Sequence, residues 1–391
     1  MTDPSVCRAV AALVLVAAGI SSALAQTAQP LITALQGFEP APDELMTEEG
    51  DFPNFGLAVA IRGNLAVAPM FRSATESRLV ILGRDTSGIW QRVAAFDTPT
   101  GFNLTGHSLA LGESRIFLGV ATTEIQVFVR SGNGWVFEQE FFTPGQSDPV
   151  TPNLAFDQGW LAVNTRGSCC TARVSLFSRR NGTWSVVQTL EGQQDENFGR
   201  DFAIEAGTLV VSAGDGVHIY RLQSNGVWVQ RQLITPPSGA AGFGSSVAIG
   251  NGLIAIGAPD AQRLDPPICG TSGASGAVYV YVPSGPSWVL RQVVSHRFAD
   301  CHFRFGSDVA ITSTHLAVKS ELVFTDYHVI DGKIALYRRT PAGTFSIVGR
   351  DRGDLSTALA LSPTTMMVGV PRDEISPGGR VSVYELADVA P

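Results

Sequence analysis

The chain has 391 residues, of which 45% are hydrophobic and only 16% charged, which is enough apolar material for a large buried core. Its 27 basic and 35 acidic residues give a net charge of −8 without any basic cluster, so we expect neither nucleic acid nor an anionic membrane surface as a partner. Beyond the first 25 residues no apolar run approaches the ~20 residues that a spanning helix needs, so membrane insertion is not expected either.

The N-terminus is typical of a targeting segment. Arg8 precedes an apolar run over residues 9–20, and Ala23-Leu24-Ala25 has the small-x-small pattern of a cleavage site before Gln26. We therefore expect residues 1–25 to be a signal peptide. Residues 26–391 are then expected to form a single monomeric domain that is exported to a periplasm or outside the cell.

The remainder of the chain repeats one phrase. The stretch GFGSSVAIGNGLIAIGAP at 242–259 returns as RFGSDVAITSTHLAV at 304–318. Taking the alanine of V-A-I as an anchor, equivalent positions recur every 45 to 62 residues, at Ala60, Ala110, Ala155, Ala203, Ala248, Ala310 and Ala360. A period of this length indicates stacked supersecondary units.

Each repeat contains the signals of four strands. A short strand of small residues holds the anchor alanine, and a second strand alternates apolar and small residues, as in Ile254-Ala-Ile-Gly. The third strand alternates with period two and usually ends on an aromatic residue: LVIL (79–82), IQVF (125–128), VSLF (174–177), VHIY (217–220), VYVY (278–281), IALY (334–337) and VSVY (381–384). Such alternation of β-branched and aromatic residues predicts strands.

The fourth strand follows a turn rich in Gly, Asn, Ser or Pro and opens with an aromatic residue: Trp90, Trp135, Trp184, Trp228, Trp288 or Phe345. Four of these aromatics have a glutamine four residues on: Gln139, Gln188, Gln232 and Gln292. Seven units of four antiparallel strands predict an all-β fold, a seven-bladed β-propeller. A β-sandwich would not require regular self-similarity, and a parallel solenoid would lack the hairpin signals.

The fourth strand has six copies where the other three have seven. The chain ends five residues after Leu386, so the seventh blade lacks its outer strand. The stretch PLITALQG at 30–37 precedes the first repeat and supplies a candidate. We expect it to pair with residues 380–386 and to close the ring, because closure removes an open sheet edge.

The repeat resembles the FG-GAP repeat, in which strand one opens on Phe-Gly and strand two ends in Gly-Ala-Pro. The fifth repeat matches best, through Phe243-Gly244 and Gly257-Ala258-Pro259; the first half recurs at Phe55-Gly56, Phe198-Gly199 and Phe305-Gly306, and fragments of the second half at Ala68-Pro69 and Val370-Pro371. The resemblance covers nearly the whole mature chain. It implies an exported, bacterial-type protein with the seven-bladed propeller of integrin α-subunits.

Calcium-bearing members of that family carry an Asp-x-Asp-x-Asp-Gly-like loop, and this sequence has none. Asp85, Asp215 and Asp331 are isolated acidic residues near turns. The histidines 296, 302 and 328 lack the close spacing of metal ligands. We therefore predict neither a metal nor a cofactor.

Four cysteines follow the predicted signal peptide. Cys269 lies in the long loop between strands two and three of the fifth repeat, and Cys301 in the connection to the sixth, so both belong to one face of a propeller. In an exported protein they are expected to form a disulfide. Cys169 and Cys170 are then a strained vicinal disulfide or two free thiols.

Binding is expected on the face that carries these long loops, 260–276 and 319–332, because variable loops on a rigid scaffold usually carry function. The candidate binding residues mix charges and aromatic anchors: Arg263, Asp265, Phe324, Asp326, Tyr327 and His328. Such loops can also be tolerated insertions without a partner. We expect the opposite face, which carries only short turns, to offer little side-chain variety.

These patterns favour an exported, non-enzymatic module that binds a protein or glycan. A hydrolase or lyase with an axial active site is the alternative, but the inner strands carry mostly Ala, Ser, Leu and Val. Asp201, Asp308 and His107 are scattered exceptions. No catalytic motif stands out, so no catalytic residue is predicted. A structural surface protein without a soluble ligand is the third possibility.

Overall fold

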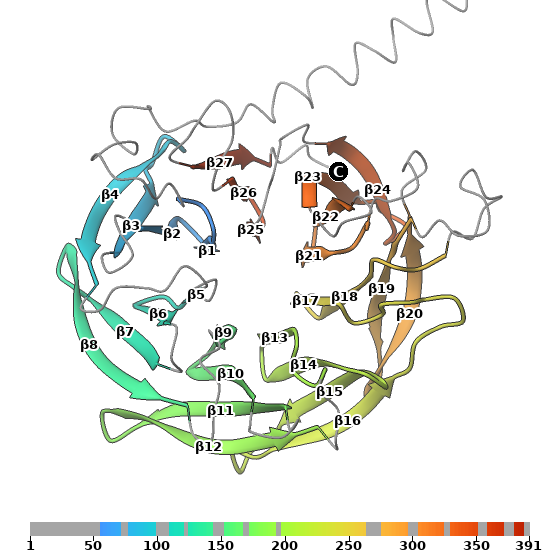
Figure 1. The fold of residues 1–391 in the computed structure, drawn as a ribbon, viewed down its shortest axis with the longest axis horizontal. Coiled ribbons are helices and arrows are strands. Elements are labelled where there is room, and N and C mark those ends of the chain that lie inside the picture. The colour runs from blue at the N-terminus through green and yellow to red at the C-terminus, as the bar shows by residue number, and fades with distance from the viewer. Residues whose placement is uncertain are drawn as a thin grey trace, which may run out of the picture.

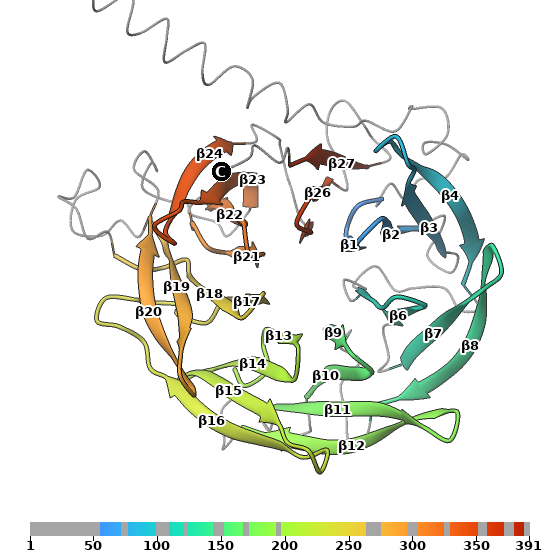
Figure 2. The ribbon, with the colours of Figure 1, turned by 180° about the vertical axis from the view of Figure 1, so that it is seen from behind.

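Seven antiparallel sheets follow one another around a central axis, as the computed structural model shows from both sides (Figures 1 and 2). The structure describes residues 55–71, 77–98, 109–120, 124–143, 152–166, 172–192, 197–262, 275–295, 304–323, 329–350, 358–370 and 379–386. The predicted all-β, seven-bladed propeller is confirmed. No helix among the described residues has the length and apolar character needed to cross a membrane.

We number the blades 1 to 7 in chain order. Blades 1 to 3 consist of β1 (Ala60–Arg62), β2 (Leu65–Phe71), β3 (Ser77–Arg84) and β4 (Trp90–Asp97); β5 (Leu109–Leu111), β6 (Arg115–Gly119), β7 (Glu124–Ser131) and β8 (Gly134–Phe142); and β9 (Leu154–Asp157), β10 (Trp160–Arg166), β11 (Ala172–Arg180) and β12 (Thr183–Glu191). Blades 4 and 5 consist of β13 (Phe202–Glu205), β14 (Thr208–Ala213), β15 (Gly216–Leu222) and β16 (Trp228–Ile234), and of β17 (Ser246–Gly250), β18 (Leu253–Ala258), β19 (Ala277–Ser284) and β20 (Ser287–Val294). Blades 6 and 7 consist of β21 (Asp308–Ile311), β22 (His315–Val323), β23 (Val329–Arg339) and β24 (Phe345–Arg350), and of β25 (Ala358–Leu361), β26 (Thr365–Val370) and β27 (Arg380–Glu385).

The anchor alanines all lie in the first, innermost strand of their blades (Figure 1). Each pairs with the residue seven positions later in strand two: Ala60 with Val67, Ala110 with Phe117, Ala155 with Ala162, Ala203 with Val210, Ala248 with Ala255, Ala310 with Ala317, and Ala360 with Met367. The first hairpin therefore has one register throughout the ring.

The middle strands are buried on both faces. In β19, for example, five consecutive residues from Ala277 are buried. Apolar clusters fill the space between neighbouring blades, such as Val67 and Leu79 of blade 1 with Ile116 and Leu118 of blade 2. This packing explains why strands two and three are continuously apolar while strand four, on the rim, alternates with exposed residues.

A β-bulge recurs between strands three and four of all six four-stranded blades. The register shifts directly before the last residue of the predicted third-strand motif, at Ile81/Leu82, Val127/Phe128, Leu176/Phe177, Ile219/Tyr220, Val280/Tyr281 and Leu336/Tyr337. The residue that follows the bulge in strand four is Gln139, Gln188, Gln232 or Gln292 in blades 2 to 5. A bulge re-aims the side chains beside it.

The two halves of the FG-GAP signature meet across the blade junctions. Gly306, which follows Phe305, has a φ of 92°, and a Cβ on Gly257 of the preceding blade would lie 2.1 Å from its carbonyl oxygen. Only a pair of glycines permits this approach. Gly56 of blade 1 and Gly369 of blade 7 repeat the contact, with 1.9 Å for a Cβ on Gly369.

The described residues thus bring the first and last blades together. Phe55 is fully buried and forms a parallel bridge with Gly379 of blade 7. The indole Nε1 of Trp90 donates to Glu385 Oε1 at 2.9 Å. Blade 7 contains three strands within the described residues, and the predicted closing strand over 30–37 lies outside them, so its role remains a prediction.

Candidate functional site

The antiparallel topology defines two faces of the ring. The loops from strand two to strand three and the connections between blades lie on one side, which we call the loop face. The turns from strand one to two and from three to four lie on the other side, which we call the turn face. The predicted binding loops belong to the loop face.

The predicted site residues themselves lie outside the described residues: Arg263, Asp265, Phe324, Asp326, Tyr327, His328, and the cysteines Cys169, Cys170, Cys269 and Cys301. Their binding role and the disulfide remain predictions. Next to them, Arg304 in the connection into blade 6 forms a two-pronged ion pair with Asp260 at the start of the blade 5 loop. The Nε–Oδ1 and Nη2–Oδ2 distances are 3.1 and 3.2 Å. This ion pair, which the sequence did not suggest, joins the base of the blade 5 loop to the connection into blade 6.

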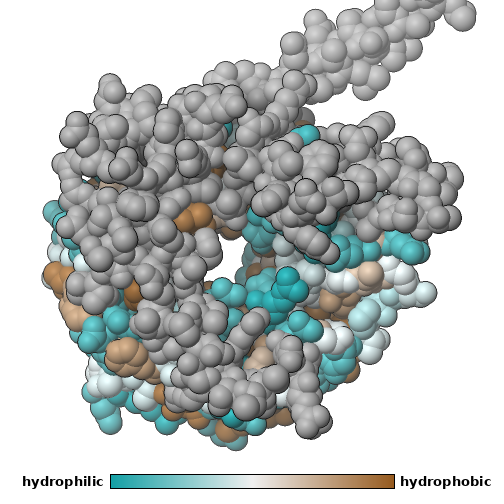
Figure 3. All heavy atoms as spheres, in the orientation of Figure 1, coloured by the Kyte–Doolittle hydropathy of each residue, from teal (hydrophilic) through white to brown (hydrophobic). Residues whose placement is uncertain are grey.

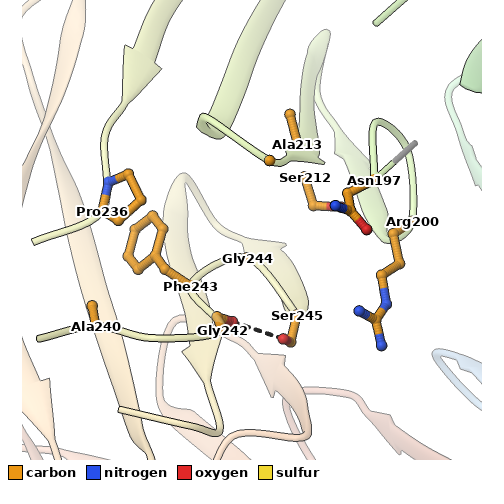
Figure 4. Close-up of a pocket in the computed structure, with 11 residues that line it drawn as sticks. Asn197, Arg200, Ser212, Ala213, Pro236, Ala240, Gly242, Phe243, Gly244 and Ser245 are labelled. Carbon is orange, nitrogen blue, oxygen red and sulfur yellow. Dashed lines mark hydrogen bonds between the residues drawn. The ribbon is translucent and has the colours of Figure 1, made fainter. Parts of the chain in front are cut away.

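A pocket opens on the loop face between blades 4 and 5 (Figure 4), with a volume of about 240 Å³. Its lining comes from the connection into blade 4, the end of β14 and the connection into blade 5: Asn197, Arg200, Ser212, Ala213, Gly214, Pro236, Ala240, Gly242, Phe243, Gly244 and Ser245. Phe243 and Gly244 are the Phe-Gly of the best-matching repeat. The motif was recognised in the sequence, but its position at a pocket was not.

The floor of this pocket is fixed. The ring of Phe243 is buried and packs in the core cluster that joins blades 4 and 5. Its backbone N–H donates to Ala240 O at 3.1 Å, and Ser245 Oγ donates to Gly242 O at 2.7 Å. The pocket therefore needs no ordering before a ligand binds, which lowers the entropic cost of binding.

Arg200 is the charged residue of the lining and it is exposed, as is Asn197. Among the described residues the Arg200 guanidinium forms no ion pair. An exposed guanidinium beside an apolar floor suits a carboxylate flanked by apolar groups, since Arg binds carboxylates through two parallel hydrogen bonds.

A channel runs along the axis and is open in the space-filling view (Figure 3). A cavity of about 430 Å³ in it is lined by Leu57, Ala58, Val59, Leu109, Asp308, Ala358 and Leu359. Burial raises the pKa of Asp308 to about 6 and, together with the charge of Asp308, the pKa of Asp201 to about 7. Two carboxyl groups of raised pKa are a combination found in catalytic sites.

The contacts of Asp201 indicate a structural role instead. Its Oδ1 accepts the N–H of Phe202 at 2.9 Å, and its Oδ2 accepts the N–H of Val247 in blade 5 at 2.6 Å. Both oxygens are thus used to hold backbone groups, one of them in the next blade. The acidic residues near turns are similar, since Asp85 Oδ1 accepts the N–H groups of Ser87 and Ile89.

Among the described residues no three His, Cys, Asp or Glu side chains gather in a way that could hold a metal ion. His107 lies outside these residues, and so does the side chain of Asp331.

Comparison with known proteins agrees with the fold. Residues 228–281 match the FG-GAP repeat family. A chain in the crystal structure of the mitotic checkpoint complex is similar, with a TM-score of 0.54 and 12% identity over 90% of this chain and 94% of that one. The RRP9 WD40 repeats give a TM-score of 0.54 and 11% identity over 90% and 100%. No curated protein matches. At such low identity these likenesses concern the fold alone.

The protein is therefore a seven-bladed β-propeller. More particularly, it is a propeller with an FG-GAP repeat, which spans the fourth strand of blade 4 and the first three strands of blade 5.

Proposed function

We propose that the protein is an exported, non-enzymatic interaction module that binds a protein partner on its loop face. The FG-GAP repeat and the propeller support the general role, because this architecture presents loops on a rigid frame. The observation that carries the proposal is the pocket between blades 4 and 5, whose lining includes the exposed Arg200 and the buried ring of Phe243.

The chemistry of this pocket selects an acidic side chain of the partner. Its carboxylate would pair with the Arg200 guanidinium, and an adjacent apolar group would cover Pro236 and Phe243. The pocket is small, so it would hold one side chain of a larger contact. The long loops of blades 5 and 6, with candidate residues such as Tyr327, would extend that contact.

Crosslinking of the tagged protein to the native extracellular fraction tests the proposal. Arg200→Glu reverses the charge at the pocket and is expected to abolish capture of the partner. Arg180→Glu is the matched control, because Arg180 is an exposed arginine at the end of β11, beside the turn to β12 on the turn face. A partner lost equally from both variants, or from neither, would remove the loop-face pocket as the binding site.

Export is tested separately. The signal-peptide pattern over residues 1–25 supports it, and N-terminal sequencing of the protein recovered from outside the cytoplasm should begin at Gln26. Recovery of the intact N-terminus from the cytoplasm alone would contradict export.

A further inference from the structure

The turn face also has a cavity, between blades 1 and 2, with a volume of about 730 Å³. Its lining includes Asn64, Asp85, Gln91, Ala94, Asn133 and Trp135. The expectation of little side-chain variety on this face is therefore wrong. The volume is within the range of small-molecule sites.

The cavity lies at a junction that lacks a repeated glutamine. At the junction of blades 2 and 3, Gln139 Oε1 accepts the Trp184 N–H at 3.3 Å. At the following junction Gln188 Nε2 donates to Trp228 O at 2.9 Å and its Oε1 accepts the Trp228 N–H at 2.8 Å, and Gln232 and Gln292 bind Trp288 and Phe345 in the same way. We call this arrangement the glutamine clamp. Blade 1 has Ala94 at the clamp position, four residues after Trp90. A methyl group cannot reach the next blade, so the space stays open.

Trp135 of blade 2 is the aromatic residue that a glutamine at position 94 would bind. Its counterparts are only 2–5% exposed: Trp90, Trp184, Trp228, Trp288 and Phe345. Trp135 is partly exposed and lines the cavity. Within the described residues no side chain hydrogen-bonds the backbone N–H or C=O of Trp135. The backbone N–H and C=O of Trp135 therefore lie beside its own partly exposed indole ring.

The charges around the cavity are largely compensated. Arg62 pairs with Asp157 at 3.1 Å, and Arg84 pairs with Glu385. Arg130 and Glu113, both exposed, have no ion pair among the described residues, and their charges are opposite. Asp85, whose Oδ1 accepts the backbone N–H groups of Ser87 and Ile89, adds one negative charge, so the cavity favours a neutral polar ligand over an anion.

We propose that the cavity between blades 1 and 2 binds a neutral carbohydrate, with one pyranose ring stacked on the indole of Trp135. The apolar C–H face of a pyranose covers an aromatic ring, while its rim carries hydroxyl groups. Two vicinal hydroxyls, one donating and one accepting, replace the glutamine amide at the Trp135 backbone. Further hydroxyls reach the amides of Asn64, Gln91 and Asn133. One ligand would thereby cover the partly exposed indole of Trp135 and hydrogen-bond its backbone N–H and C=O.

Titration calorimetry of the full-length protein tests this with defined probes: neutral hexasaccharides of glucose, mannose, galactose and xylose, and oligogalacturonate as the acidic probe. At least one neutral hexasaccharide is expected to bind with one-to-one stoichiometry. Trp135→Ala is expected to weaken it by about tenfold or more, as for other central aromatic contacts.

Ala94→Gln separates binding from folding. It rebuilds the clamp, so it is expected to raise the melting temperature while abolishing saccharide binding. Arg180→Glu, on the same turn face but outside the cavity lining, is the control and leaves saccharide binding unchanged. The proposal is overturned if no neutral saccharide binds, if only oligogalacturonate binds in a salt-sensitive way, or if Ala94→Gln binds as the wild type does. Loss of a captured protein partner, rather than of a saccharide, on Ala94→Gln would assign the cavity to a protein.

Discussion

The junction between blades 4 and 5 and the junction between blades 1 and 2 fill the same three sequence positions with different residues. Between blades 4 and 5, Asp201, Glu205 and Gln232 each hydrogen-bond the backbone of the next blade. Asp201 binds the N–H of Val247, Glu205 those of residues 251 and 252 at 2.8 and 3.0 Å, and Gln232 both backbone groups of Trp288.

Between blades 1 and 2 the same positions hold Ala58, Arg62 and Ala94. The two alanines cannot hydrogen-bond through their side chains, and Arg62 pairs with Asp157 of blade 3 instead. Apolar packing between the blades persists, since the cluster around Val67 and Ile116 is fully buried. Apolar packing therefore holds neighbouring blades together at both junctions, whereas, of the two, only the junction between blades 4 and 5 has side-chain hydrogen bonds from these three positions to the next blade within the described residues.

Removing a clamp should have the largest effect. Gln232→Ala leaves the backbone N–H and C=O of buried Trp288 without partners, and each unsatisfied buried group costs about 1–3 kcal/mol. The free energy of unfolding is expected to fall by about 3 kcal/mol, measured by urea denaturation. Gln230→Ala on the same strand is the control, because Gln230 is exposed and should change stability by less than about 0.5 kcal/mol. Equal effects of the two substitutions would mean that the clamp does not stabilise the junction.

The axial carboxyl groups should make stability depend on pH. The pKa of Asp201 is raised from 3.8 to about 7 and that of Asp308 from 3.8 to about 6. A raised folded-state pKa contributes stability below the unfolded-state value, and that contribution is lost as the pH rises through the folded-state value. The free energy of unfolding, measured by urea denaturation, is therefore expected to fall between about pH 4 and pH 7, by on the order of 2 kcal/mol.

Asp308→Asn checks the origin of this slope. It removes one titrating group and also the negative charge that raises the pKa of Asp201. The free energy of unfolding should therefore depend less steeply on pH. The neighbouring charges, Arg200, Lys319 and Glu321, are unchanged. Glu138, whose pKa the guanidinium of Arg115 lowers, contributes with the opposite sign, because its stabilisation is lost as the pH falls. An unchanged slope in Asp308→Asn would contradict the axial origin.

Much of the fold could be predicted from the sequence because the repeat is local. Period-two alternation fixes which residues form strands, and self-similarity fixes how many sheets there are. The strands seen at β19 and β20, for instance, begin within one residue of the predicted VYVY motif and Trp288. The sequence also shows the glutamine four residues after the aromatic. It does not show the role of that glutamine, because the clamp joins residues 40 to 56 positions apart in different blades.

The candidate sites were less predictable for the same reason. A pocket depends on which side chains fail to fill a junction, and Ala94 stands out only once the other junctions are seen to be clamped. Arg200 and Phe243 are 43 positions apart and meet at one pocket only because blades 4 and 5 are neighbours. Conversely, loop length pointed to residues such as Phe324, which lie outside the described residues. Loop length indicates a face of the ring but not a position on it.

Rebuilding the missing clamp should change the free energy of unfolding least, and should raise it where Gln232→Ala lowers it. Ala94→Gln places an amide where Gln188, Gln232 and Gln292 have theirs, next to a Trp135 backbone that no described side chain binds. Two new hydrogen bonds to partly solvated groups are worth about 1 kcal/mol, since those groups already bond water in the wild type. The urea midpoint should rise accordingly. Ala95→Gln is the matched control, because Ala95 is the exposed neighbour on β4 and the same side chain there has no backbone to bind. A gain in Ala95→Gln as large as in Ala94→Gln would attribute the effect to strand propensity, and a loss in Ala94→Gln would mean that this junction differs from the clamped ones in more than one residue.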